Sequence, residues 1–184
     1  MLIKYAYVQN VPDLSVDYYI DSFDDGEYLN HVAGFNGMDV CVDYVKQLIR
    51  DGYRLINLCG DFNDAYVEEI MKDAPEGTEV KYAAYLPEEL AKLEALEQYI
   101  EYGQIILANV DEPVRRDILA PEMNTHTVYV KDLEQAASAA RQLAERGVDG
   151  IELCGWFDLE KTKRIIEAVE SVDKTIPVGS NGIC

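Results

Sequence analysis

The chain has 184 residues, of which 48% are hydrophobic, enough to bury the core of one domain or of two small ones. It carries 16 basic and 35 acidic residues, a net charge of −19, which argues against nucleic acid and against an anionic membrane surface as partners. No stretch approaches the ~18 apolar residues of a membrane span, and the first residues lack the features of a signal peptide, so we expect a cytoplasmic protein.

The first half of the chain alternates strands and helices around an acidic stretch, residues 10–30. We predict that this stretch is a solvated loop rather than a calcium site, because Phe23 and Val32 stand where an EF-hand loop starting at Asp21 needs oxygen ligands. Asn63 is a good N-cap residue. The pattern predicts strands at 2–8, 31–35, 54–59 and 79–85, and helices at 39–51 and 63–73.

The second half repeats this order after a connecting helix. Pro87 suits the first turn of that helix, and Gly103 follows its last residue. A polar loop is expected at 111–125. The remaining predictions are strands at 104–110, 126–130, 149–154 and 176–180, and helices at 131–146 and 159–172.

These elements predict an α/β protein made of two tandem β-β-α-β-α-β units with mostly parallel strands, related by a pseudo-twofold axis. The units would span residues 1–86 and 103–184, with the connecting helix at 87–102. A single doubly wound sheet and a small closed barrel are the alternatives. A full TIM barrel needs eight helices, more than the five expected here.

A constant offset of 95 residues relates the two halves. The only two histidines, His31 and His126, obey it (126 − 31 = 95). The same offset relates Gly52, Ile56, Leu58, Cys59, Gly60 and Phe62 to Gly147, Ile151, Leu153, Cys154, Gly155 and Phe157. Because the period exceeds the roughly 20–50 residues of solenoid repeats, each half is a whole small unit.

The second of these runs resembles a family of small bacterial proteins of unknown function. Its pattern reads Val-Asp-x-Ile-Glu-Leu-Cys-Gly-Gly-Phe and is followed by a helix and a Val-Pro-Val-Gly strand. Trp156 replaces the second glycine of the Gly-Gly pair here, and Asp61 replaces it in the first half. The first half diverges further, with Arg54 and Asn57 in place of Asp and Glu. The resemblance implies two tandem copies of this domain and no particular activity.

The repeated run places polar side chains at the end of a strand. Side chains alternate along a strand, so Glu152 and Cys154 share one face, as do Asn57 and Cys59 in the first copy. Ligands bind at such carboxyl ends of strands, and a following helix N-terminus can lower the pKa of a thiol. Gly60 and Gly155 lie at these same ends and are candidate ligand-binding residues.

His31 and His126 are further candidate ligand-binding residues. Each begins a predicted strand, whereas the cysteine of its copy ends one, which separates them by about 16 Å at ~3.3 Å per residue. Only a contact between copies would pair His31 with Cys154 and His126 with Cys59. We therefore expect histidines hydrogen-bonded to a loop rather than a His–Cys dyad within one copy.

Four cysteines, Cys41, Cys59, Cys154 and Cys184, show no C-x-x-C spacing, which predicts free thiols and neither a zinc site nor a redox pair. No other metal site is expected, and the sequence leaves the cofactor unknown.

Two hypotheses follow from these residues. The favoured one is a non-catalytic α/β protein that binds a small molecule or serves as a pseudo-dimeric interaction module. The alternative is an enzyme acting on a small metabolite, with Cys154 as nucleophile or acid/base, Glu152 as base or metal ligand, and Asn57 as orienting partner. Tyr99 and Tyr102, near the connecting helix, suggest a homo-oligomer contact.

Overall fold

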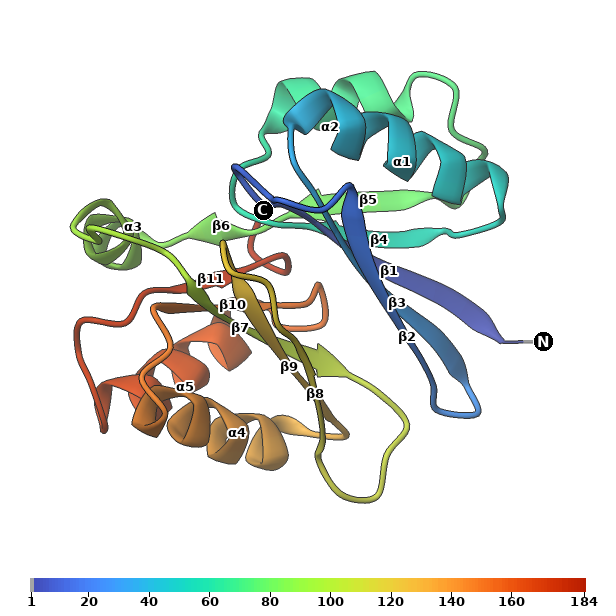
Figure 1. Cartoon of the computed structure of the whole chain (residues 1–184). Helices are drawn as coiled ribbons and strands as arrows, with labels where there is room; N and C mark the ends of the chain where they lie inside the picture. The colour runs from blue at the N-terminus through green and yellow to red at the C-terminus, as the bar shows by residue number, and fades with distance from the viewer. Residues whose placement is uncertain (1) are drawn as a thin grey trace. The chain divides into compact units, whose positions relative to one another are not determined.

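The computed structural model describes residues 2–184 and divides the chain into two compact units, Met1–Tyr82 and Ala83–Cys184. Each unit contains one sheet of mostly parallel strands with helices packed on it, so the predicted α/β class and the two similar units are confirmed. Figure 1 shows both sheets and their helices.

The first unit contains a five-stranded sheet in the order β2-β3-β1-β4-β5. β2 runs antiparallel to β3, and the other neighbours are parallel. The strands are β1 Ile3–Asn10, β2 Tyr18–Asp24, β3 Tyr28–Phe35, β4 Leu55–Leu58 and β5 Glu79–Tyr82, and the helices are α1 Met38–Arg50 and α2 Asp64–Met71.

The second unit contains a six-stranded sheet in the order β6-β11-β10-β7-β9-β8. Its two edge strands, β6 and β8, are antiparallel to their neighbours. The strands are β6 Ala84–Tyr85, β7 Glu101–Leu107, β8 Val114–Ile118, β9 Asn124–Val130, β10 Gly150–Leu153 and β11 Val178–Ser180, and the helices are α3 Pro87–Glu94, α4 Leu133–Glu145 and α5 Leu159–Glu170.

Strand order explains why both helices of a pair lie on the same face of their sheet (Figure 1). In the first unit, α1 leads from β3 past β1 to β4, and α2 continues in the same direction to β5. Right-handed crossovers that advance in one direction place their helices on one side. The second unit repeats this with α4 and α5. α1 and α2 therefore share one face of the first sheet, and α4 and α5 share one face of the second.

Two strands lie where the sequence predicted polar loops. β2 falls within residues 10–30 and β8 within residues 111–125, and each pairs antiparallel with the next strand. Both are edge strands, whose exposed positions accept charged residues such as Asp24 and Asp117. The charged side chains of β2 and β8 obscured the alternating strand pattern, and each of these strands adds one to the four predicted for its copy.

The segment predicted as a helix over 87–102 is helical only at its start. α3 ends at Glu94, and β7 begins at Glu101 because this segment pairs in parallel with β9 and β10. The predicted strand 79–85 is also divided: β5 belongs to the first sheet and β6 to the second. Tyr102 is therefore a buried strand residue, only 3% exposed.

Candidate functional site

The repeated motif forms the same strand–turn–helix in both copies. β4 leads through a turn in which Phe62 N donates to Cys59 O at 3.3 Å, and after β10 Phe157 N donates to Cys154 O at 3.1 Å. The helices that follow are capped by side chains, since the side chain of Asn63 accepts from Ala65 N at 3.0 Å. The prediction of Asn63 as an N-cap is confirmed.

Both motif thiols accept a hydrogen bond from a neighbouring strand. Cys59 Sγ accepts from the backbone N of Asn10 at 3.3 Å, and Cys154 Sγ accepts from that of Leu107 at 3.4 Å. Both cysteines are buried. Burial raises the pKa of the Cys154 thiol above its ordinary value and outweighs the opposing hydrogen bonds from the backbone of Leu107 and Trp156. The protonated thiol is therefore the resting form at neutral pH.

The polar residue two positions earlier also has an equivalent partner in each copy. Asn57 Oδ1 accepts from the phenol of Tyr5 at 2.8 Å, and Glu152 accepts from the phenol of Tyr102. Glu152 receives a second hydrogen bond, from Tyr85 at 2.6 Å. Glu152 is only 3% exposed, and burying a carboxyl group costs free energy unless the group is hydrogen-bonded.

Glu152 and its partner Tyr102 lie on the sheet face opposite α4. A Cβ built at Gly103 would lie 3.4 Å from Leu143 Cδ1 of α4, so Gly103 faces that helix. Alternation then turns Tyr102 and Gln104 the other way, and Gln104 is paired in register with Glu152. Gln104 accepts from Thr127 at 3.0 Å, which extends this polar row to β9.

His31 lies on the face that α1 covers. Its Nε2 lies 2.6 Å from the hydroxyl of Tyr44 on α1, and its Nδ1 lies 3.1 Å from the hydroxyl of Ser22 on β2. Burial lowers the pKa of His31, with Asp21 acting in the opposite direction. The expected hydrogen bond to a loop is instead made to a strand and a helix.

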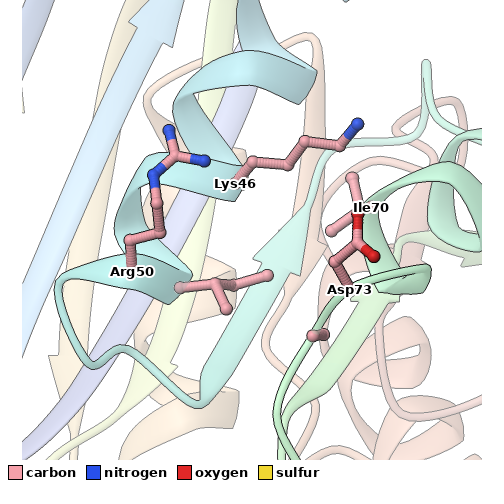
Figure 2. A pocket seen from close by; sticks show the side chains of 6 residues that line it. Lys46, Arg50, Ile70 and Asp73 are labelled. Carbon is pink, nitrogen blue, oxygen red and sulfur yellow. The ribbon is translucent and has the colours of Figure 1, made fainter.

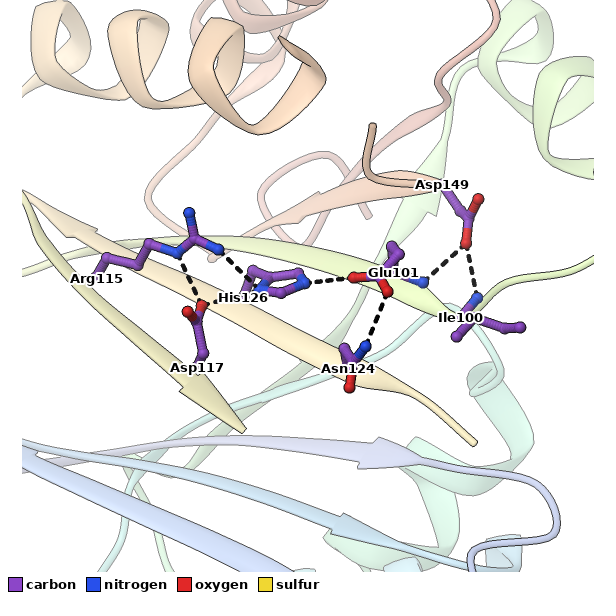
Figure 3. A network of polar contacts seen from close by, with 7 residues as sticks. All are labelled: Ile100, Glu101, Arg115, Asp117, Asn124, His126 and Asp149. Carbon is purple, nitrogen blue, oxygen red and sulfur yellow. Dashed lines mark hydrogen bonds and ion pairs between the residues drawn. The ribbon is translucent and has the colours of Figure 1, made fainter. Parts of the chain in front are cut away.

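His126 occupies the equivalent position within a network of charges (Figure 3). Its Nε2 lies 2.5 Å from Glu101 Oε2, and its Nδ1 lies 2.8 Å from Asp117 Oδ1. Arg115 Nε donates to the same Asp117 oxygen at 2.8 Å. The hydrogen bond from His126 lowers the pKa of Glu101. For Asp117, burial raises the pKa, but the hydrogen bonds from Arg115 and His126 outweigh it, and the pKa is lowered.

Within each copy the histidine and the motif cysteine are far apart along the sheet, as the sequence indicated. His31 pairs in register with Ala6, whereas Cys59 bonds Asn10, which lies four residues further along β1 (10 − 6 = 4). This corresponds to about 13 Å at ~3.3 Å per residue. The second copy has the same spacing between its own histidine and cysteine partners on β7.

The first unit contains a pocket that no sequence motif indicated. It has a volume of about 270 Å³ and lies between α1 and the C-terminal end of α2. Figure 2 shows Lys46 extending from α1 toward Ile70 and Asp73, while the guanidinium of Arg50 lies along α1. The lining residues combine an apolar floor with charged groups: Lys46, Ile49, Arg50, Ile70, Asp73 and Ala74.

One sequence signal could have found this pocket. Lys46 and Arg50 are four residues apart, so they share one side of a helix in a chain with 35 acidic and only 16 basic residues. The pocket is distinct from the predicted site residues, and the roles predicted for Cys154, Glu152, Asn57, Cys59, Gly60, Gly155, His31 and His126 stay predictions.

Comparisons with known proteins identify a family but no activity. The sequence model of a family described as "Family of unknown function (DUF6506)" matches residues 3–98 and again residues 101–182. No curated protein matches the chain. A solved carbohydrate transporter from Acidothermus cellulolyticus 11B, in complex with myo-inositol, is similar at a TM-score of 0.33 and 9% identity, over 98% of this chain and 74% of that one. A similarity at this level carries no functional argument. Among residues 2–184, no helix is both long and apolar enough to cross a membrane.

Proposed function

The chain belongs to the DUF6506 family, in two tandem copies, and we propose that it is a non-catalytic protein that binds a small molecule in the pocket between α1 and α2. The observation that carries the proposal is the pocket itself: about 270 Å³ with an apolar floor and charged rim. Small-molecule sites are typically concave and mostly apolar, with a few polar groups that orient the ligand.

The second copy differs from the first at this groove. By the offset of 95, Ile49 and Arg50 of α1 correspond to Ala144 and Glu145 of α4 (144 − 49 = 95). The buried alanines of α4 allow α5 to pack closely against it, and α5 has 12 residues where α2 has 8. Two residues that line the pocket between α1 and α2, Ile49 and Arg50, are thus replaced at equivalent positions of the second copy, which supports a binding role confined to the first copy.

The motif thiols support a non-catalytic role. Cys59 and Cys154 make the same hydrogen bond to a backbone N–H in both copies, although their neighbours Asn57 and Glu152 differ. This hydrogen bond, which has the same structural role in each copy, explains why cysteine occurs at this position in both copies. The raised pKa of Cys154 argues against a thiolate nucleophile. The enzyme alternative, with Cys154 and Glu152 acting on a metabolite, stays a prediction.

The proposal is tested by NMR with a library of small metabolites. We expect amide shifts confined to α1 and α2 for at least one compound. Ala74→Phe fills the pocket and should abolish those shifts. Ala65→Phe places the same bulk on an exposed position of α2 outside the pocket and should preserve them. The proposal would be contradicted if binding persists in Ala74→Phe. It would also be contradicted if no compound of the library, at millimolar concentration, shifts the amide signals of the pocket residues.

A further inference from the structure

We infer that the ligand of this pocket is a zwitterionic amino acid with an apolar side chain, an inference that rests on the function proposed above. The pocket offers separate partners for each part of such a molecule. Lys46 and Arg50 lie on its α1 side, Asp73 on its α2 side, and Ile49, Ile70 and Ala74 form the apolar surface.

The α1 side is suited to a carboxylate. Lys46 Nζ is held at 2.6 Å by Glu69, and Glu69 also binds Lys72 at 2.5 Å. These hydrogen bonds hold the pKa of Glu69 at about 2, so its charge is constant at physiological pH. One anion, Glu69, is thus shared by two cations, Lys46 and Lys72, which is a local excess of one positive charge. In a chain of net charge −19, such a local excess favours an anionic group there.

The opposite side of the pocket is suited to an ammonium group. Asp73 lies near the C-terminal end of α2, just past its last residue, Met71, and lines the pocket across from Lys46 (Figure 2). Helix C-termini carry partial negative charge, which adds to that of the carboxylate. A ligand with both charges would therefore be oriented along the line from α1 to α2.

The apolar floor is suited to an aliphatic side chain. Ile70 is 2% exposed and Ile49 is 5% exposed, so both are anchored in the core and offer a fixed surface. A pocket of about 270 Å³ is large enough for an amino acid of the size of leucine. Two of the three charged positions are specific to this copy, since Arg50 and Asp73 correspond to Glu145 and Ala168 in the other, whereas Lys46 corresponds to Arg141 (141 − 46 = 95).

The test compares L-leucine with two analogues that each lack one charge, by calorimetry and by NMR of the full chain. 4-Methylpentanoate lacks the ammonium group, and isoamylamine lacks the carboxylate. We expect each analogue to bind at least about tenfold more weakly than leucine, the usual effect of losing one charged hydrogen-bond partner.

Two variants assign the ends of the ligand. Lys46→Gln should weaken leucine and 4-methylpentanoate but not isoamylamine, and Asp73→Asn should weaken leucine and isoamylamine but not 4-methylpentanoate. The inferred ligand class is wrong, and the binding function stands, if both analogues bind as tightly as leucine. The same conclusion follows if a library compound without charged groups shifts the NMR signals of the pocket residues while leucine does not. If no compound shifts them, the binding function is wrong as well.

Discussion

The phenol of Tyr102 donates a hydrogen bond to the buried carboxylate of Glu152 across two neighbouring strands, β7 and β10. The first copy has the same arrangement with Tyr5 and Asn57, so the acceptor is a carboxylate in one copy and an amide in the other. Because this hydrogen bond from a tyrosine occurs in both copies with different acceptors, it is a structural feature of the duplicated unit. Its strength should nevertheless differ between the copies.

Removing the phenol should destabilise the second unit more than the first. Tyr102→Phe leaves a buried carboxyl group short of a donor, which costs about 1.5–3 kcal/mol, whereas Tyr5→Phe should cost about 0.5–1.5 kcal/mol. Urea unfolding measures both, with the fluorescence of Trp156, the single tryptophan, reporting the second unit. Equal losses in the two variants would show that the carboxylate adds nothing beyond the amide.

The thiols should divide into one reactive and three protected groups. Cys184 is exposed, whereas Cys41, Cys59 and Cys154 are buried, and burial raises the pKa of Cys41 to about 12. Alkylation of the native protein, resolved by peptide mass spectrometry, should therefore modify Cys184 alone near neutral pH. Rapid alkylation of Cys154 with an apparent pKa below ~8.5 would instead support the catalytic alternative.

His31 should titrate below its ordinary pKa of 6.5, because burial disfavours the charged ring. The unfolded chain then takes up this proton first, so the free energy of unfolding should fall as the pH drops from about 6.5 toward the folded pKa. With only two histidines, proton NMR resolves each titration. His31→Gln assigns the signal and should remove this slope; a midpoint at or above 6.5 contradicts the prediction.

The network around His126 should stabilise the second unit in a different pH range. The pKa values of Glu101 and Asp117 are lowered in the folded state, so their contribution is present above the ordinary values of 4.5 and 3.8 and is lost as the pH falls through the lowered ones. Because both carboxylates are partly exposed, His126→Gln should cost only about 0.5–1 kcal/mol at pH 7.

The control for this network is a double-mutant cycle. Glu101→Gln combined with His126→Gln should show a coupling free energy at pH 7 that is lost as the pH falls through the lowered pKa of Glu101, because that carboxylate then becomes protonated. A coupling that is independent of pH would mean that His126 acts through packing alone.

The contrast between the two histidines comes from their neighbours rather than from their strands. Ser22 pairs with His31 where Asp117 pairs with His126. Two residues before the strand partner of each histidine, Ala6 and Gly103, the first copy has Lys4 and the second has Glu101. Equivalent backbone positions therefore hold a serine and a lysine in the first copy and two carboxylates in the second. The sequence contains both replacements, but only the sheet register shows that they surround the histidines.

The sequence by itself determined the duplication, the alternation of strands and helices, the mostly parallel sheets and the cap at Asn63. These features depend on local periodicity and on residues near in the chain, which the sequence displays directly. The tertiary structure decided which distant residues meet. In the tertiary structure β2 and β8 are edge strands, and a pocket lies beside Lys46. α3 ends at Glu94, and Tyr102 lies on the strand that follows, where it contacts Glu152. Strand pairing and helix packing depend on contacts between residues far apart in the chain, and no local pattern records the partner.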